Sequence, residues 1–218
     1  MTILYSNGCS YTANLDLARD ERYPIILSKK LGWSCQDRAE PGSCNSRIIR
    51  TTIEDCIKLR KQSNEKIFAM VQLSHLYRTE YPDDTNPIGD PFYSIRPNIV
   101  SDAPEDAVKY STLYWKLHNE RQLLIHLLTG LIGLTGYFNQ NNINYLIYLG
   151  PGENIIYTTY LKDDVRFAYL KKDSGILDLE KFYMLELLDK KDAHPDQLGM
   201  QKISNYFYEK INLLSEQV

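Results

Sequence analysis

The stretch Ile3-Leu4-Tyr5-Ser6-Asn7-Gly8-Cys9-Ser10-Tyr11-Thr12 is the starting point for reading the fold of this chain. Its apolar beginning predicts a buried strand over residues 2–5, and Gly8 marks the turn that follows. Residues 23–31 then carry apolar side chains at helical spacing, and Gly32 stops that pattern. A strand, a turn that bears the small hydroxyl residue Ser10, and a helix therefore open the protein.

The same alternation of strand and helix continues along the chain. Strand patterns cover residues 66–73 and 144–149, and helical patterns cover residues 48–59, 105–138 and 197–214. Short apolar strands separated by helices are typical of a parallel sheet covered on both faces. We therefore expect an α/β fold, a three-layer α/β/α sandwich with a mainly parallel central sheet, built as one domain over residues 1–218. The Tyr-, Pro-, Asp- and Gly-rich segment at about 77–104 is expected to be an irregular insertion or lid.

Composition excludes several classes of function. The chain has 25 Lys and Arg against 28 Asp and Glu, a formal net charge of -3, so nucleic acid is not favoured as a partner. No stretch approaches the roughly twenty apolar residues of a membrane span. The beginning of the chain lacks the features of a secretory signal, and we expect a cytoplasmic location with no membrane partner.

The four cysteines are Cys9, Cys35, Cys44 and Cys56. Their spacing matches neither paired zinc knuckles nor a disulfide framework, so we expect free buried thiols. Cys9 and Cys44 both flank the proposed site, and one of them could instead serve as a nucleophile.

The candidate catalytic residues are Ser10 and those of Asp192-Ala193-His194-Pro195, near the C-terminal end of the sequence. A serine hydroxyl is a poor nucleophile at neutral pH unless a base takes its proton, and a histidine does so when a carboxylate fixes its tautomer. Loops after the carboxyl ends of strands hold the ligands of open α/β sheets, and Ser10 follows such an end. The structural alternatives are that Ser10 is a turn or N-cap residue and that His194 is a surface loop residue.

Three blocks of sequence resemble those of the SGNH hydrolases, the GDSL-like esterases and lipases. Residues 8–12 stand where that family has Gly-Asp-Ser, residues 42–48 resemble its second block, and residues 192–199 resemble its last block. The resemblance is closest to divergent members from tailed-phage genomes, in which Gly-Cys-Ser commonly replaces Gly-Asp-Ser, and implies a flavodoxin-like sandwich and a host-cytoplasmic location. It also implies that Ser10 attacks the ester carbonyl, that His194 transfers the proton and that Asp192 orients the His194 imidazole. The backbone N–H groups of Ser10 and Gly42 would stabilise the oxyanion.

Two positions depart from the family pattern. The third block, Gly-x-Asn-Asp, is missing, because the corresponding strand continues as Ser74-His75-Leu76-Tyr77-Arg78. Ser74, His75, Arg78 or Asn45 could replace the absent donor; alternatively, Asn45 caps the next helix, and His75 and Arg78 are solvated loop residues. Asp192 precedes His194 by two positions rather than the usual three, so His194 could also act without it in a dyad.

We therefore expect a serine hydrolase that cleaves an acetyl or other small acyl ester on a carbohydrate-like (glycan) or small-molecule substrate, with no metal and no organic cofactor. The alternatives are a catalytically silent binding or assembly protein of this fold and an acyltransferase. Homo-oligomers are possible. The aromatic residues of the insertion could line a pocket, fix the insertion to the sheet or form a dimer patch; they are Tyr77, Tyr81, Phe92 and Tyr93. His118 and His126 fit core or interface positions.

Overall fold

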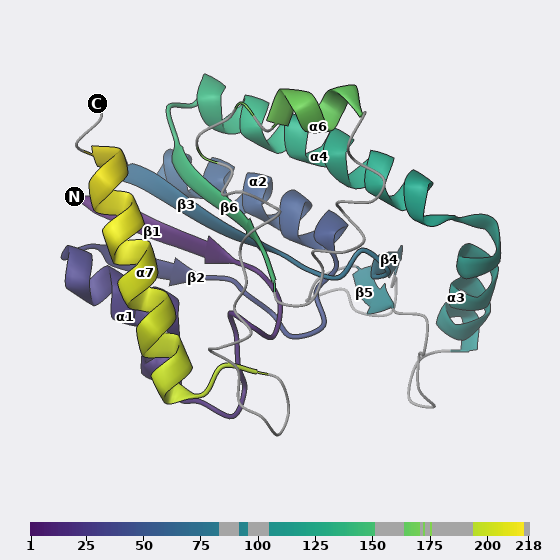
Figure 1. Cartoon of the computed structure of the whole chain (residues 1–218), viewed down its shortest axis with the longest axis horizontal. Helices are drawn as coiled ribbons and strands as arrows, with labels where there is room; N and C mark the ends of the chain where they lie inside the picture. Colours follow the sequence, from purple (N-terminus) through teal and green to yellow (C-terminus); the bar gives the residue numbers. More distant parts are fainter. Residues whose placement is uncertain are drawn as a thin grey trace.

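A parallel sheet forms the centre of the protein in a computed structural model, which describes residues 1–82, 92–95, 105–150, 164–170, 172, 175 and 194–215. Its four strands lie in the order β2-β1-β3-β6, and all three pairings are parallel. The strands are β1 (Thr2–Asn7), β2 (Ser34–Asp37), β3 (Lys66–Leu73) and β6 (Asn144–Leu149). Their carboxyl ends meet at one edge, as the doubly covered α/β fold requires (Figure 1).

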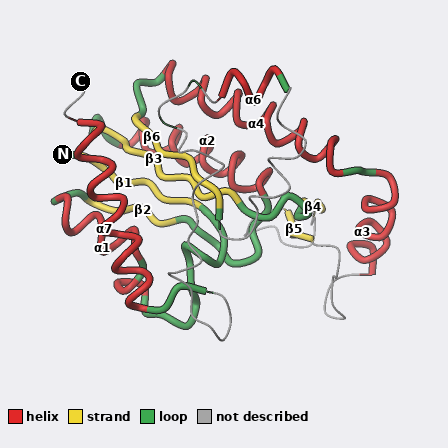
Figure 2. Tube along the Cα trace, in the orientation of Figure 1, coloured by secondary structure: helices red, strands yellow, loops and turns green. Residues whose placement is uncertain are grey.

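Two helical layers cover this sheet. Helices α2 (Asn45–Gln62) and α4 (Glu120–Gln140) pack on one face, and α1 (Tyr23–Leu31) and α7 (Gln197–Ser215) pack on the other (Figures 1 and 2). Helix α6 (Val165–Leu170) lies against α4, and the short 3-10 helix η1 (Arg19–Glu21) precedes α1. The predicted three-layer α/β/α sandwich is confirmed.

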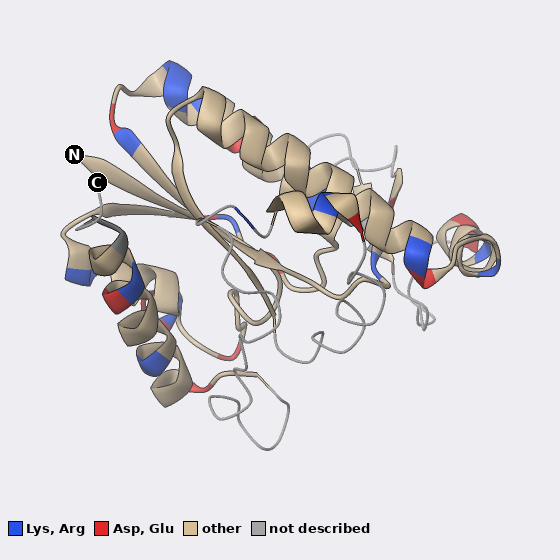
Figure 3. Ribbon diagram, turned by 45° about the horizontal axis from the view of Figure 1, so that its top comes forward, with Lys and Arg blue, Asp and Glu red and all other residues tan. Residues whose placement is uncertain are grey.

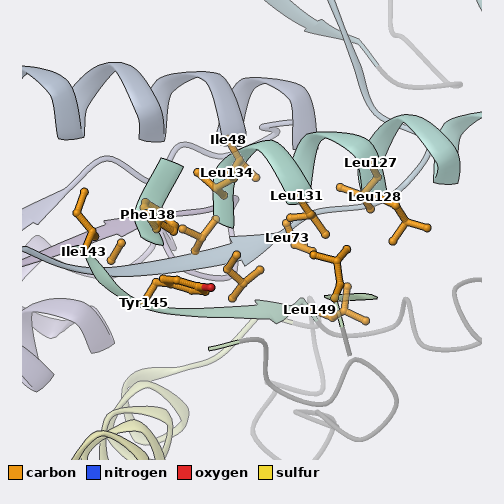
Figure 4. Packing of buried hydrophobic residues seen from close by; sticks show 14 of the residues in the cluster. Ile48, Leu73, Leu127, Leu128, Leu131, Leu134, Phe138, Ile143, Tyr145 and Leu149 are labelled. Carbon is orange, nitrogen blue, oxygen red and sulfur yellow. The ribbon is translucent and has the colours of Figure 1, made fainter. Parts of the chain in front are cut away.

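Alternation along the strands divides the core into two clusters. In β3, Ala69 and Val71 face the α2/α4 layer, whereas Phe68 and Met70 face the α1/α7 layer. This is the period of two expected when both faces of a strand are buried. Leucines of α4 fill the space above β3 and β6 (Figure 4), and truncating one such leucine to alanine costs about 2–5 kcal/mol.

Three local features differ from the sequence-based expectation. The expected single helix over 105–138 is two helices, α3 (Glu105–Leu117) and α4, because Asn119 accepts a bond from the Gln122 N–H (3.0 Å) and caps the second. Residues 34–37 form the edge strand β2, which the expectation omitted. Strands β4 (Thr79–Pro82) and β5 (Phe92–Ile95) form an antiparallel pair within the segment expected to be irregular. Residues 83–91 and 96–104 of that segment lie outside the described residues.

Aromatic contacts hold this hairpin to its neighbours. The ring centroid of Tyr81 lies 5.3 Å from that of Tyr110 in α3, and Tyr77 lies 5.9 Å from Trp115. The Arg50 guanidinium lies 4.4 Å above the Phe92 ring. These contacts fix the hairpin and the residues before it to helices α2 and α3, whereas the expected structural use was attachment to the sheet.

Charged residues of both signs are spread over the helices (Figure 3). Among the helices in the described ranges, none combines the length and the apolar character needed to cross a bilayer.

Candidate active site

Ser10 lies in a tight turn directly after β1. The carbonyl oxygen of Cys9 accepts hydrogen bonds from the N–H groups of Thr12 and Ala13, both at 3.0 Å, and Ser10 is half-buried at the bend between them. The first α-helix begins only at Tyr23, with Arg22 as its N-cap. Ser10 therefore caps no helix, and its hydroxyl lies on the loop at the carboxyl edge of the sheet.

A buried glutamine supports this turn from below. Gln72, near the end of β3, accepts a hydrogen bond from the Thr12 hydroxyl at 2.5 Å and donates one to the Cys9 sulfur at 3.5 Å. A Cβ on Gly8 would lie 2.8 Å from the Gln72 Cβ, and one on Gly150 would lie 2.6 Å from the Gln72 Nε2. Both positions require glycine because the glutamine lies directly against their backbones.

The start of the turn is tied to α2 by Asn7, a fully buried residue. Its amide nitrogen donates to the hydroxyls of Thr51 (2.9 Å) and Thr52 (3.0 Å), and its amide oxygen accepts from the Gly8 N–H at 2.9 Å. Buried polar networks of this kind fix a single backbone geometry when every member is satisfied. The segment that carries Ser10 is thus held on a rigid base.

Gly42 lies in a turn next to Gly8. The N–H of Ser43 donates to the carbonyl oxygen of Glu40 at 3.2 Å, and Gly42 has a φ of +82°, which matches a type II turn with Pro41 before the glycine. The Glu40 N–H donates to the Gly8 carbonyl oxygen at 3.1 Å, so the two loops run together.

The buried Arg47 clamps the Gly42 turn from helix α2. Its guanidinium bonds the Ser43 hydroxyl at 3.0 Å and forms an ion pair with Glu40. The Gly42 turn is therefore fixed to α2 and, through the Glu40–Gly8 hydrogen bond, to the loop that carries Ser10.

Asn45 and Ser74 bind one another. The Asn45 amide nitrogen donates to the Ser74 carbonyl oxygen at 3.0 Å, and its oxygen accepts from the Ser74 N–H at 2.7 Å. Arg78 donates to the Ser74 hydroxyl at 3.0 Å and to the Ser43 carbonyl oxygen at 3.4 Å. The N-cap of α2 is Cys44, whose sulfur accepts from the Arg47 N–H, so the alternative that Asn45 caps this helix is wrong. These residues join the end of β3 to the Gly42 loop.

His194 reaches the same edge from the far end of the chain. Its ring stacks on Tyr11, with centroids 5.0 Å apart and an interplanar angle of 30°, and the centroid of His75 lies 6.4 Å from that of Tyr11. The Asn14 amide donates to the Pro195 carbonyl oxygen at 3.0 Å, and Asp196 accepts from the Gly199 N–H at the start of α7. The structure thus brings the segments of Ser10 and His194 together, while Asp192 lies outside the described residues.

All four cysteines are free thiols, and three of them are buried. Burial raises the pKa of Cys35 and of Cys56 to about 12, which keeps both thiols protonated and unreactive at neutral pH. Within the described part of the chain, no group of three or more His, Cys, Asp or Glu side chains could hold a metal ion.

Sequence reasoning did not identify the residues that support the loops. Tyr11, Asn14, Arg47 and Gln72 are absent from the expected site. Gln72 carries a readable signal, because it is a polar residue in the otherwise apolar strand Lys66–Leu73. Asn14 and Tyr11 contact Pro195 and His194, which lie about 180 residues away in the sequence, so no local sequence pattern predicts these contacts.

By sequence, no family model and no curated protein matches the chain. Solved structures do resemble it. A protein of the lipolytic G-D-S-L family from Desulfitobacterium hafniense superposes with a TM-score of 0.55 at 10% identity, covering 96% of this chain and 99% of that one. The psychrotrophic esterase EstA from Pseudoalteromonas gives 0.54 at 12% identity, covering 99% and 98%. The acetyl xylan esterase Est2A from Butyrivibrio proteoclasticus gives 0.51 at 11%, covering 98% of this chain and 64% of that one. The chain therefore has the fold of the SGNH, or GDSL-like, hydrolases.

Proposed function

We propose that this protein is a serine ester hydrolase whose nucleophile is Ser10 and whose general base is His194. The observation that carries the proposal is the meeting of residues 10–14 with residues 194–195 through the Tyr11–His194 stack and the Asn14–Pro195 hydrogen bond. A hydroxyl and an imidazole carried by adjoining loops at the carboxyl edge of a parallel sheet are the parts that acyl transfer needs.

In the proposed reaction, the Ser10 oxygen forms a bond to the ester carbonyl carbon while its proton passes to His194. The carbonyl electron pair moves onto the oxygen, and the backbone N–H groups of Ser10 and Gly42 stabilise that charge. Collapse of the intermediate expels the alcohol, which takes the proton back from His194. Water then attacks the acyl-enzyme in the same way and releases the acid. Asp192 is the proposed group that orients the imidazole.

The proposed substrate carries an acetyl or another small acyl group on a carbohydrate-like or small-molecule alcohol. The fold is shared with an acetyl xylan esterase, and the structural neighbour EstA is described as inhibited by monoethylphosphonate. Reactive phosphonates form a covalent bond with an activated serine oxygen, so a fluorophosphonate is a suitable probe of Ser10. Comparing p-nitrophenyl acetate, longer p-nitrophenyl esters and acetylated xylan would define the acyl and alcohol preferences.

The decisive experiment combines activity with labelling. We expect the purified protein to hydrolyse p-nitrophenyl acetate and to be labelled by a fluorophosphonate at Ser10, located by mass spectrometry. Ser10→Ala and His194→Gln should each reduce kcat by about 10³-fold or more. Ser63→Ala is the matched control, because Ser63 follows α2 at the opposite edge of the sheet, and it should retain both signals. Absence of both signals in the wild type would refute the proposal.

One observation favours a second candidate, a non-catalytic binding protein of the same fold. Both the oxygen and the nitrogen of the Asn45 amide are bonded to the backbone of Ser74, which opposes the use of Asn45 as the missing oxyanion donor. A wild-type protein that is folded and stable but unreactive toward both esters and the fluorophosphonate would support this candidate.

A further inference from the structure

A cavity of about 340 Å³ lies between α2, α4 and the start of the β4–β5 hairpin. Its apolar wall is formed by Ile49, Leu76, Leu123 and Leu127. Ser10 and His194 are not among the residues that line it. The cavity is therefore separate from the proposed nucleophile and base, and its volume falls in the range of small-molecule sites.

Gly130 keeps part of this space open. It lies inside the 21-residue helix α4, where glycine costs about 1 kcal/mol relative to alanine. A Cβ added there would lie 2.9 Å from the Ile49 Cδ1, and because both Gly130 and Ile49 line the cavity, a side chain at position 130 would project from the cavity side of the helix. The helix thus lacks a side chain at the point where one would occupy the cavity.

The charged side chains of the described lining are both arginines. Arg50 and Arg78 line the cavity, and none of the lining residues that the structure describes is an aspartate or a glutamate. Arg50 is paired with Glu80 at 2.7 Å and Glu54 at 3.5 Å. In the part of the chain that the structure describes, the oxygens bonded by Arg78 belong to a hydroxyl and a carbonyl and are uncharged. The field at Arg78 therefore favours an anion.

We propose that this cavity binds a small carboxylic acid with an apolar body. The carboxylate pairs with the Arg78 guanidinium, whose planar fork of donors matches two carboxylate oxygens. The apolar body lies against Ile49, Leu123 and Leu127 and beside Gly130, where removal of its surface from water supplies the affinity. Because Arg78 also bonds Ser43 and Ser74, the ligand lies next to the Gly42 loop without using the Ser10 site.

The test uses 4-phenylbutyrate as the acid and 4-phenylbutan-1-ol as its neutral analogue, titrated by calorimetry into the Ser10→Ala protein. Hydrolytic activity then plays no part, so failure of this proposal and failure of the proposed function remain distinguishable. We expect saturable one-to-one binding of the acid. Arg78→Met should weaken the acid by about tenfold or more and the alcohol by less than twofold, whereas Arg121→Met, on the exposed start of α4, should change neither.

Gly130→Leu should abolish binding because its side chain occupies the cavity, and Gly133→Leu, an exposed position on the same helix, should preserve it. Amide chemical-shift mapping on the Ser10→Ala protein without further changes gives an answer that does not depend on whether the leucine variant folds. Shifts at residues 45–50 and 126–130 support the site. No saturable binding, shifts confined to residues 10–12 and 194, or equal affinity for the acid and the alcohol would overturn the proposal.

Discussion

Tyr11 is the residue through which the two ends of the candidate site meet. Its ring stacks on His194 and approaches His75. The ring also lies close to Gly150, because a Cβ added to that glycine would be 3.5 Å from the Tyr11 Cδ2. An imidazole that rests on an aromatic face has fewer orientations available, and an imidazolium gains from the negative face of the ring. Tyr11 is therefore a positioning residue for the proposed base.

Replacing Tyr11 by alanine should lower kcat for ester hydrolysis by about 10- to 100-fold, because a base displaced by about 1 Å loses that much rate. Tyr11→Phe, which keeps the ring and therefore the stack on His194, should retain the wild-type kcat. Steady-state kinetics with p-nitrophenyl acetate measure both variants. A kcat of the alanine variant equal to that of the wild type would contradict the positioning role.

Asp37 gives a pH-dependent prediction at the same scale. Its side chain is 1% exposed, and burial raises its pKa above the ordinary value of 3.8, although the Ala39 N–H and Arg22 oppose that shift. A raised pKa means that the folded chain holds this proton more tightly than the unfolded chain. The contribution of Asp37 to the free energy of unfolding therefore decreases as the pH rises from about 4 through the folded-state pKa.

Urea unfolding of the wild type and of Asp37→Asn at several pH values between 4 and 7 measures this contribution. The free energy of unfolding of the wild type, relative to that of the variant, should fall as the pH rises through this range. The absolute difference at one pH also contains the lost pairing with Arg22, so the slope is the informative quantity. A flat or rising difference would show that burial does not dominate at this carboxylate.

At the scale of elements, most of the architecture could be predicted from the sequence. Strands β1, β3 and β6 are apolar runs bounded by turn residues, and α7 carries a clear apolar stripe, so pattern alone locates them. Strand β2 was missed because Ser34–Asp37 is a short edge strand with alternating exposure and no apolar run. The break between α3 and α4 was missed because apolar residues continue on both sides, and only Asn119 marks the boundary.

The Asn119 cap can be tested directly. Asn119→Ala removes the acceptor for the Gln122 N–H at the start of α4, and should lower the free energy of unfolding by about 1 kcal/mol. Asn119→Asp, which keeps an acceptor oxygen, should stay within about 0.5 kcal/mol of the wild type. Urea denaturation monitored by circular dichroism is the measurement. Equal loss in both variants would mean that the amide N–H groups of Asn119, and not its capping oxygen, stabilise the helix.

At the scale of the whole molecule, the sequence indicates the residues of the proposed site, and the topology brings their segments together. Ser10, Gly42 and His194 were proposed from motif positions, and parallel strands send the loops after β1 and β2 to one edge. The sequence does not predict how the segment that carries His194 is attached to the Ser10 loop. That attachment includes the hydrogen bond between Asn14 and Pro195, which are 181 positions apart. Long-range polar contacts between loops leave no periodic pattern to read.

The Asn14–Pro195 contact therefore carries the last prediction. Asn14→Ala leaves the buried carbonyl of Pro195 without this donor and should cost about 1–3 kcal/mol of stability. The loop that carries His194 should then lose its fixed position, lowering kcat about tenfold and accelerating amide hydrogen exchange at residues 197–200. Gln197→Ala is the matched control, because its exposed bond to Glu21 joins the same two segments, and it should change stability by less than about 0.5 kcal/mol. If both variants lose activity equally, the two ends are held together by their shared packing and not by the buried amide.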